Sequence, residues 1–459
     1  MPTAYNDDVD LQIWSRGTDL ERRELIEEWS EFHIDLKWSD MSTWSLTLPT
    51  DEFMKKYGVA NLNNQTLAGA GGIKVFRNGE YYPLISGPIT EAKRDWNGSK
   101  DEIILTGMDD KYWLTTRIIG PSWIAWPSYT WWYDNAGGTY GWDISQGYSG
   151  VSCEYLMKAL LYWNVDWAGN NQGGSHSHCI PWFYSGTIGS PQCGSAVSYQ
   201  ARLETAFTVC KNVCLMNTGG AHLGDSDIQF NVVQPYDGYS TIGGINYKLF
   251  FTVDPIVDLT SRGIFGTDFG TVRSYTYDEK RPEANYTIAG GPDIDPTSHV
   301  SSSEVGFRYY SMQQNANSIA TYGRIEEFLD VNVPPPAAGG AAYNFSDLNS
   351  IMSTKSLAEL KLKAYNATAE IALMPDEMTQ CGNYYEGDGD FYLGAKVTVK
   401  LNQQYITDVI RELKFDFTPD KGEIVTPTVC DAYQFYHTKP MPFTHDDRWG
   451  LADIRRNWK

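Results

Sequence analysis

The middle of the chain contains thiol and imidazole side chains of the kind that bind metal ions. His176, His178 and Cys179 are nearly consecutive, and Cys193 follows in the same Gly-rich stretch. Thiolate sulfur and imidazole nitrogen are preferred ligands of tetrahedral zinc, and a structural zinc would stabilise a segment that has little core of its own. The spacing matches no established zinc motif, so we favour unpaired thiols, then disulfide bonds, and only then zinc.

A run of aromatic residues could bind a different class of ligand. Trp123, Trp126, Trp131 and Trp132 lie close together in the sequence. Flat rings stack well on the faces of sugars, but such rings more often fill a core or a subunit interface. We therefore favour a core or an interface and keep sugar binding as the alternative.

An acidic segment lies further along the chain. Residues 386–390 alternate carboxylates with glycine, which could wrap a hard cation such as calcium, but no bidentate Glu stands at position twelve of such a loop. We expect a solvated turn before the strand at Phe391.

The chain lacks the short motifs of several large enzyme classes. It contains no Gly-x-Ser-x-Gly nucleophile elbow, no phosphate-binding loop ending in Lys-Ser or Lys-Thr, and no His-Glu-x-x-His zinc helix. Glycoside hydrolysis needs only two carboxylates, and the 57 acidic residues leave that alternative open. We predict a protein that is not an enzyme and that carries no cofactor and no metal.

Composition restricts the binding partners further. The 459 residues include 36 Lys and Arg against 57 Asp and Glu, a net charge of −21, so phosphate backbones and anionic membranes would repel the chain. Hydrophobic residues make up 42% and aromatic residues 14%, which predicts several folded domains. Residues 1–10 lack the pattern of a secretion signal, and no segment has the roughly 20 apolar residues of a membrane span, so we expect a soluble protein made in a cytoplasm.

The first 118 residues show the alternation of polar and apolar residues that is typical of antiparallel strands. We expect strands at 11–14, 32–38, 44–48, 71–76, 81–85, 89–94 and 102–106. Asn78-Gly79 favours a tight hairpin turn between the fourth and the fifth of them. These strands predict an N-terminal barrel or sandwich over 1–118.

Composition changes after Arg117, where Trp and Gly become frequent. We predict an α+β insertion domain over 119–245, with a helix from Cys153 to Trp163, and a β-rich middle domain over 246–340. The segment 333–340 is rich in Pro and Gly and is typical of a linker.

The C-terminal region, 341–459, combines a helical and a strand pattern. Apolar residues at helical spacing predict a helix over Ser356–Ile371, with Ser356 as its N-cap. Strands are expected from there to about Phe417.

Two segments far apart in the chain share a sequence pattern. Gly72-Ile73-Lys74-Val75 leads to Ile89-Thr90-Glu91, and Gly394-Ala395-Lys396-Val397 leads to Ile410-Arg411-Glu412. The spacing from Val to Ile is 14 residues in the first and 13 in the second. Two unrelated hairpins could share these residues, whereas duplication of a domain would produce both hairpins at once. We predict a mainly β fold with an α+β insertion, built from two related β-barrel domains plus a middle domain.

Several of these segments resemble a known family. A strand ends at Leu48-Pro49, the segment Ile85-Ser86-Gly87-Pro88-Ile89 follows, a strand closes on Gly107-Met108-Asp109, and Phe391–Val399 forms a later strand. In these segments the chain resembles the minor tail proteins of siphophages, specifically the baseplate hub or tail-associated proteins. The resemblance covers about 1–118 and 385–417, and the turn at Asn402-Gln403 lacks the Asn-Gly pair of the first hairpin.

The resemblance implies a structural virion protein at the tail tip, assembled in the host cytoplasm. The family is similar to the central hub ring of contractile-phage baseplates, in which each of three subunits supplies two tail-tube-like barrels. A homotrimer of this kind joins the sixfold tail tube to a threefold tip and forms part of the DNA ejection channel. Asp388, Asp390, Asp408 and Glu412 are candidates for an acidic channel wall.

The resemblance also implies partners. They are further copies of the chain, the distal tail protein, the tape measure protein and other tail-tip proteins, with DNA only in transit. Two alternatives remain: a receptor-recognition protein that binds a host surface glycan, and a tail-borne glycoside hydrolase.

Overall fold

The computed structural model describes the greater part of the chain. The described residues are 11–57, 71–77, 80–119, 151–166, 179–187, 193–197, 199, 204–217, 228–235, 240–266, 270–294, 307–331, 345–373, 381–387, 389–401, 404–418 and 422–430. None of the described helices is both long and apolar enough to span a bilayer.

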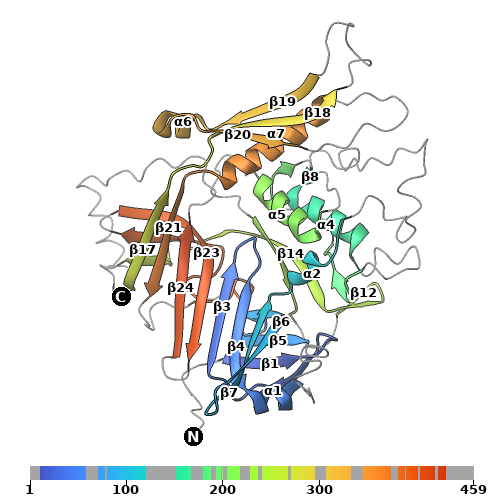
Figure 1. The fold of residues 1–459 in the computed structure, drawn as a ribbon, viewed down its shortest axis with the longest axis vertical. Coiled ribbons are helices and arrows are strands. Elements are labelled where there is room, and N and C mark those ends of the chain that lie inside the picture. The colour runs from blue at the N-terminus through green and yellow to red at the C-terminus, as the bar shows by residue number, and fades with distance from the viewer. Residues whose placement is uncertain are drawn as a thin grey trace.

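The largest element is a 14-stranded sheet (Figure 1). Its main path runs β17-β21-β24-β23-β3-β4-β7-β6-β5-β1-β2, and β22, which pairs with β15 and β16, attaches to β23. The N-terminal strands are β1 (Leu11–Arg16), β2 (Arg22–Leu25), β3 (Glu31–Lys37), β4 (Thr43–Pro49), β5 (Gly72–Arg77), β6 (Ile85–Trp96) and β7 (Asp101–Met108). The later strands are β15 (Val257–Asp258), β16 (Ile264–Gly266), β17 (Val272–Lys280), β21 (Asn366–Leu373), β22 (Ala395–Leu401), β23 (Gln404–Thr418) and β24 (Gly422–Cys430).

Alternating side chains hold this sheet to its core. In β23 the side chains of Leu413, Phe415 and Phe417 are buried, while the residues between them are only partly buried. Side chains alternate between the two faces of a strand, so one face of the sheet packs inward and the other stays polar. One hydrophobic core contains residues from both ends of the chain, including Leu46, Leu105 and Phe415, with helix α1 (Thr50–Tyr57) packed against β4 and β7.

The insertion after β7 has its own core. It contains the helices α2 (Tyr112–Thr115), α4 (Cys153–Asn164) and α5 (Ala206–Met216) and the short strands β8 (Val151–Ser152), β9 (Phe183–Tyr184), β10 (Ala196–Val197), β11 (Ile228–Val233), β12 (Ser240–Ile242), β13 (Ile245–Tyr247) and β14 (Leu249–Pro255). Ser152 and Thr205 cap the two longer helices by accepting hydrogen bonds from Tyr155 N and Thr208 N. Strand β11 pairs with β14, and both contribute buried residues to this second core.

A third layer lies at the top of the molecule in Figure 1. It consists of β18 (Tyr286–Ile294), β19 (Phe307–Gln314), β20 (Glu326–Asp330), α6 (Ala316–Tyr322) and α7 (Phe345–Leu362). Helix α7 packs on β18 and β19 and contacts α5, which links this layer to the insertion.

The predicted fold class, mainly β with an α+β insertion, is confirmed. The helix predicted from Cys153 is confirmed as α4. Among the described strands the path of the large sheet is open, so the two expected barrels form one continuous sheet here. That sheet and the β11–β14 pair both cross predicted boundaries, and the division into 1–118, 119–245, 246–340 and 341–459 stays a prediction.

Two local predictions are wrong. The helix expected over Ser356–Ile371 ends at Leu362, and Ser356 lies inside α7 rather than at its start. Ile371 is fully buried in strand β21, because the alternating pattern of residues 366–373 fits a sheet better than a helix. Residues 81–84 form no strand, since β5 pairs with β6 only from Ile85 onward. The turn Asn78-Gly79 and the linker 333–340 lie outside the described residues.

Candidate functional site

The large sheet contains the same arrangement of strands twice. The order β3-β4-β7-β6-β5 in the N-terminal half matches the order β17-β21-β24-β23-β22 in the C-terminal half. Every neighbouring pair in both series is antiparallel. We call these two series the N-terminal and the C-terminal half-sheet.

The two long strands show the duplication in detail. Strand β6 pairs first with β5 and then with β7, and its register shifts between Ile89 and Glu91. Strand β23 pairs first with β22 and then with β24, and its register shifts between Ile410 and Glu412. A bulge bends a strand and increases its twist, so each long strand turns from one part of the sheet into the next at the same place. The repeated hairpins therefore lie in units of the same strand topology.

Each repeated hairpin begins with a glycine at a position where a larger residue would clash with a neighbour. A Cβ atom on Gly72 would lie 2.1 Å from the carbonyl oxygen of Gly87 on the neighbouring strand. Gly394 has a φ of +82°, and a Cβ there would lie 1.7 Å from the Trp38 ring. Only glycine fits these close approaches without displacing a neighbour.

The half-sheets meet at a seam between β3 and β23. Phe32 and Phe417 lie opposite each other on the buried face, and their rings stack with centroids 5.8 Å apart. On the other face, His33 Nδ1 lies 2.6 Å from Asp416 Oδ1. The seam thus combines aromatic packing on one side with polar pairs on the other.

Opposite charges continue along the seam. Lys37 Nζ lies 3.0 Å from Asp35 Oδ2 and 3.9 Å from Glu412 Oε1, and Lys414 lies directly opposite Asp35. Burial, together with the neighbouring Asp35 carboxylate, raises the pKa of Glu412 to about 7. These cross-strand pairs select the register, because a shift of two residues would place like charges opposite each other.

Acidic side chains predominate on the polar face of the paired half-sheets. Cross-strand pairing places these charged residues on that face: Glu31, Asp35, Glu91, Asp95, Glu102, Asp278, Glu370, Glu412 and Asp416 with Lys37, Lys93, Lys280 and Lys414. Carboxylates outnumber lysines among them, so the face is acidic.

A buried ion pair joins the N-terminal half-sheet to the insertion. Arg16 Nη1 donates hydrogen bonds to both carboxylate oxygens of Asp110, at 2.9 and 2.8 Å, and neither side chain is exposed. Ser86 Oγ and Trp113 Nε1 also donate to this carboxylate, at 2.5 and 3.1 Å. Gln234, which follows β11, accepts a further bond from Arg16 at 3.3 Å. These bonds connect β1, and β6 of the N-terminal half-sheet, with the insertion in one buried network.

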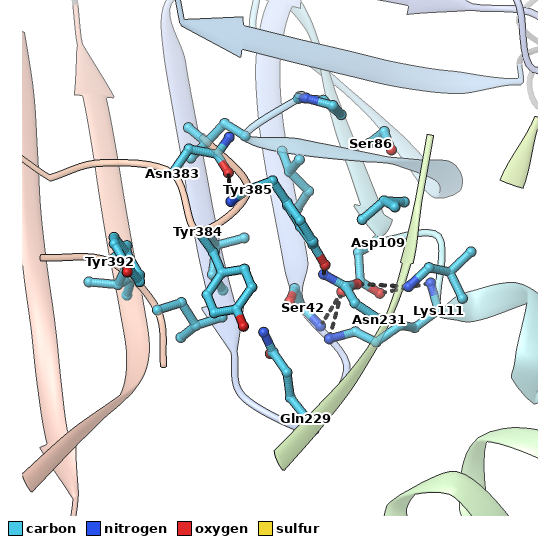
Figure 2. Close-up of a pocket in the computed structure, with 18 of the residues that line it drawn as sticks. Ser42, Ser86, Asp109, Lys111, Gln229, Asn231, Asn383, Tyr384, Tyr385 and Tyr392 are labelled. Carbon is cyan, nitrogen blue, oxygen red and sulfur yellow. Dashed lines mark hydrogen bonds and ion pairs between the residues drawn. The ribbon is translucent and has the colours of Figure 1, made fainter. Parts of the chain in front are cut away.

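A small cavity of about 80 Å³, lined by both polar and apolar side chains, lies beside this network (Figure 2). Lys111 Nζ lies 3.1 Å from Asp109 Oδ2, and Ser42 N donates to the same oxygen at 3.2 Å. Burial raises the pKa of Asp109, although Lys111 acts in the opposite direction. Asn231 and Tyr385 reach the same cavity from β11 and from the segment before β22, as Figure 2 shows.

The Tyr385 hydroxyl fastens the insertion to the C-terminal half. It donates to Asp254 Oδ2 at 2.9 Å, and it accepts from Asn231 Nδ2 at 3.1 Å. Thr252 Oγ1 donates to Asp254 Oδ2 at 3.1 Å. Burial raises the pKa of Asp254 to about 6 and raises the pKa of Tyr385 well above its usual value. These polar groups satisfy one another, so the arrangement is typical of a structural joint.

The thiols singled out from the sequence are packing groups where the structure describes them. Cys179 is buried and Cys193 is half-buried, and no set of three or more metal-binding side chains comes together among the residues with described positions. His176 and His178 lie outside the described residues. Cys153 and Cys193 are free thiols, and burial raises the pKa of the first to about 12 and of the second to about 11.

The other predicted residues have different outcomes. Trp123, Trp126, Trp131 and Trp132 lie outside the described residues, as does Asp388. Asp390 is half-buried, and Glu412 lies on the polar face. Asp408 is only 1% exposed, so the expectation that it could face a channel is wrong. It lies in the part of β23 that pairs with β22, opposite Val397.

The sequence patterns did not reveal the buried ion-pair network around Asp110 or the seam between β3 and β23. The consecutive charges of Asp109-Asp110-Lys111 follow strand β7 directly, and all three side chains are buried. Buried charges need partners, so this run was a usable signal once burial was known. The seam had a weaker one: Asp35-Leu36-Lys37 is repeated as Asp278-Glu279-Lys280. Nothing local showed that β3 and β23 pair.

Several solved structures of tail proteins are similar to this chain. The chain is similar to the 43 kDa tail protein of prophage MuSo2 from Shewanella oneidensis, with a TM-score of 0.46 and 10% identity over 91% of this chain and 98% of that one. It is similar to a tail protein from Neisseria meningitidis MC58, with a TM-score of 0.47 and 9% identity over 93% and 98%. A prophage tail protein, gp18 from Listeria monocytogenes EGD-e, has a TM-score of 0.43 and 8% identity over 97% and 99%.

Two comparisons with known sequences gave different results. No curated protein matches this chain. One family profile matches residues 10–430, which is nearly the whole chain. This match confirms the siphophage resemblance, and the chain belongs to the Siphovirus ReqiPepy6 Gp37-like protein family.

Proposed function

We propose that this siphovirus protein is the baseplate hub of the virion tail. Three copies form a ring that joins the sixfold tail tube to a threefold tip and forms part of the DNA ejection channel. The distal tail protein, the tape measure protein and other tail-tip proteins are its neighbours. The observation that carries the proposal is the duplicated half-sheet.

Duplication within one chain is what a symmetry adapter requires. Each copy contributes two units of the same strand order, so three copies present six similar units toward a sixfold tube. The insertion and the third layer occur once in each chain, and they would give the other end of the ring its threefold character. Buried networks around Asp110 and Tyr385 support a rigid connection between these parts.

The acidic polar face supports the role of a channel wall. Proteins that grip DNA neutralise phosphates with Lys and Arg, and each neutralised phosphate strengthens binding at low salt. A face on which carboxylates outnumber lysines does not bind phosphates in this way, so DNA can pass along it without being held. Glu412 at the seam and Glu91 on β6 are members of this face.

The solution mass and the symmetry of the particle test the hub. We expect a species of three times the 51.7 kDa chain mass by light scattering, and threefold rings with six similar lobes in electron micrographs. A stable dimer, or a chain that stays monomeric at high concentration and within isolated tails, would contradict the hub.

The proposed role needs no catalysis. Incubation of the purified protein with host cell wall and capsule should release no reducing sugar. Release that one carboxylate substitution abolishes would establish the glycoside hydrolase instead. Binding of purified host glycans, lost when Trp131 and Trp132 are replaced by Ala, would establish receptor recognition.

A further inference from the structure

Strands β17 and β6 each leave an edge of the large sheet without a partner among the described residues. Strand β17 pairs on one side only, with β21. The outer half of β6, residues 89–96, pairs on one side only, with β7. From Glu91 to Trp96 every residue except Ala92 is exposed, and most of β17 is exposed as well. Open edges of this length are templates for pairing with another chain.

The equivalence of the two half-sheets predicts which strand should pair with each open edge. Strand β6 occupies in the N-terminal half-sheet the place that β23 occupies in the C-terminal one, and β17 corresponds in the same way to β3. Within the chain, β23 pairs with β3. We infer that β17 of one copy pairs with the outer half of β6 in the next copy, so that the contact between copies repeats the seam within each copy. This inference deepens the proposed hub ring and rests on it.

Strand direction agrees with this pairing. Neighbouring strands alternate in direction along the path from β17 to β6, and the path contains eight strands. The two edge strands of one copy therefore run in opposite directions. Joining β17 to a second copy's β6 gives an antiparallel pair, as at the seam. Such a head-to-tail contact closes into a ring when the rotation between copies fits a whole turn.

The equivalence can be assigned residue by residue on the β17 side. Asp35 lies opposite Thr43 of β4, and Asp278 lies opposite Thr368 of β21. Each Asp is followed two residues later by a lysine that contacts it: Lys37 Nζ lies 3.0 Å from Asp35 Oδ2, and the corresponding distance from Lys280 to Asp278 is 3.7 Å. The Asp-x-Lys segment of β3 thus has a direct counterpart on the open edge.

The β6 side is aligned by its bulge. Ile89 and Glu91 flank the register shift in β6 as Ile410 and Glu412 do in β23, and Lys93 then corresponds to Lys414. Lys93 follows Glu91 by two residues, as Lys414 follows Glu412. The order of charges at the seam is therefore repeated on the open edge of β6.

The transferred register is complementary in charge. It places Glu91 opposite Lys280 and Lys93 opposite Asp278 across the contact. Sliding the strands by two residues would place Lys93 opposite Lys280 and Asp95 opposite Asp278, or Glu91 opposite Asp278 in the other direction. A slide by one residue would turn the buried face outward. Only the register of the seam matches charges at both positions.

The opposite face of the contact is aromatic. In the transferred register, Trp96 faces Tyr275 and Arg94 faces Tyr277, where the seam has Phe417 facing Phe32 and Phe415 facing Ile34. Trp96 is 68% exposed and Tyr277 is 41% exposed in the single chain. Tyrosine, tryptophan and arginine are enriched where surfaces are buried between proteins. These side chains have the composition of an interface that covers them on assembly.

Paired cysteines test the register directly. The double variant K93C/D278C should form disulfides between copies in the purified full-length protein, seen as covalent multimers on non-reducing gels. The matched variant D35C/K414C occupies the equivalent positions of the seam and should form its disulfide within one chain. K93C/S274C is the register control, because Ser274 lies about 13 Å along the strand from Asp278 and a disulfide needs Cα atoms within about 7 Å.

Charge reversal is an independent measurement. K93E or D278K alone should weaken association of copies about tenfold in light scattering or sedimentation, because like charges would then face each other. The combined variant K93E/D278K should restore association. K55E, which makes the same charge change on the exposed surface of α1, should leave it unchanged.

The outcomes separate this inference from the proposed hub. Covalent multimers of K93C/D278C together with rescue by K93E/D278K establish the contact. A trimer that persists in K93E and D278K, with no interchain disulfide while D35C/K414C closes, overturns the contact and leaves the hub standing. A wild-type chain that remains monomeric in solution and in tails overturns the hub itself.

Discussion

Phe32 of β3 and Phe417 of β23 stack across the seam with ring centroids 5.8 Å apart, although they come from opposite ends of the chain. Neither side chain is exposed, and both belong to the single core that the two half-sheets share. The two halves of the duplication therefore fold as one body, and stability of either half depends on the other.

Replacing one of these two phenylalanines by alanine should destabilise the whole folded chain. We expect Phe417→Ala to lower the free energy of unfolding by about 3–5 kcal/mol, because a buried aromatic side chain is lost and a cavity remains. Ile424→Ala, on the exposed side of β24, is the matched control and should cost less than about 1 kcal/mol. Denaturant titration followed by circular dichroism measures both. Equal losses in the two variants would contradict a shared core at the seam.

Breaking the buried ion pair should be costly for an electrostatic reason. Arg16→Met leaves the Asp110 carboxylate buried without its cation, and removing one partner of such a pair typically costs about 3–5 kcal/mol. Arg23→Met breaks an exposed pair with Asp19 and should change the free energy of unfolding by about 1 kcal/mol or less. Thermal and denaturant unfolding of both variants tests this. A loss in Arg16→Met no larger than in the control would show that the network does not hold the insertion.

Asp254 should make stability depend on pH in the acidic range. Burial raises its pKa from about 3.8 to about 6, so the folded state keeps a proton that the unfolded state releases. Its favourable contribution is fully present below about pH 4 and is lost as the pH rises through about 6, an effect on the order of 3 kcal/mol.

The substitution Asp254→Asn removes this titration while keeping an oxygen that can accept from Tyr385. Relative to wild type, the variant should gain free energy of unfolding between pH 4 and pH 7 and reach a plateau above that. Glu28→Gln, at an exposed carboxyl, should show no such gain. Parallel unfolding curves at all pH values would refute the assignment.

The thiols should differ in reactivity according to burial. Burial raises the pKa of Cys153 to about 12, and Cys210 is buried in α5, so neither should react with iodoacetamide at pH 8 in the native protein. Cys193 is half-buried and should be labelled sooner, although its raised pKa keeps the reaction slow. Mass spectrometry of labelled peptides over time gives the rates. Labelling of Cys153 as fast as that of Cys193 would contradict the packed core of the insertion.

The local sequence pattern was sufficient to predict many of the strands. Alternation predicted β1, β3, β4 and β7, because a strand with one buried face has an apolar residue at about every second position. Strand β5 was predicted from the Asn78-Gly79 hairpin signal instead. The capped helix after Ser152 was predictable for the same kind of reason. The hairpin echo predicted two units of the same strand order, and the structure contains them, although the close contacts of Gly72 and Gly394 differ: one approaches the Gly87 backbone and the other the Trp38 ring.

Sequence patterns misled where two periods competed. Residues 356–371 contain apolar positions that fit a helix, yet the chain leaves α7 at Leu362 and enters β21. The neighbours of β21 are β17 and β24, which come from 272–280 and 422–430 and offer it two partners. Hydrogen bonds to distant strands overruled local preference, as they often do.

Residue patterns along the chain were enough to predict the class of fold, the strands with one buried face, the acidic balance and the resemblance to the family. The pairing of β3 with β23 and the contacts of Arg16 with Asp110 and of Tyr385 with Asp254 became known from the three-dimensional structure alone. The physical reason is that strand pairing and buried polar bonds depend on which distant segments meet and in what register, and no local pattern carries that information. The open edges of β17 and β6 became visible only when the strand order was known, because an edge is a property of the whole sheet.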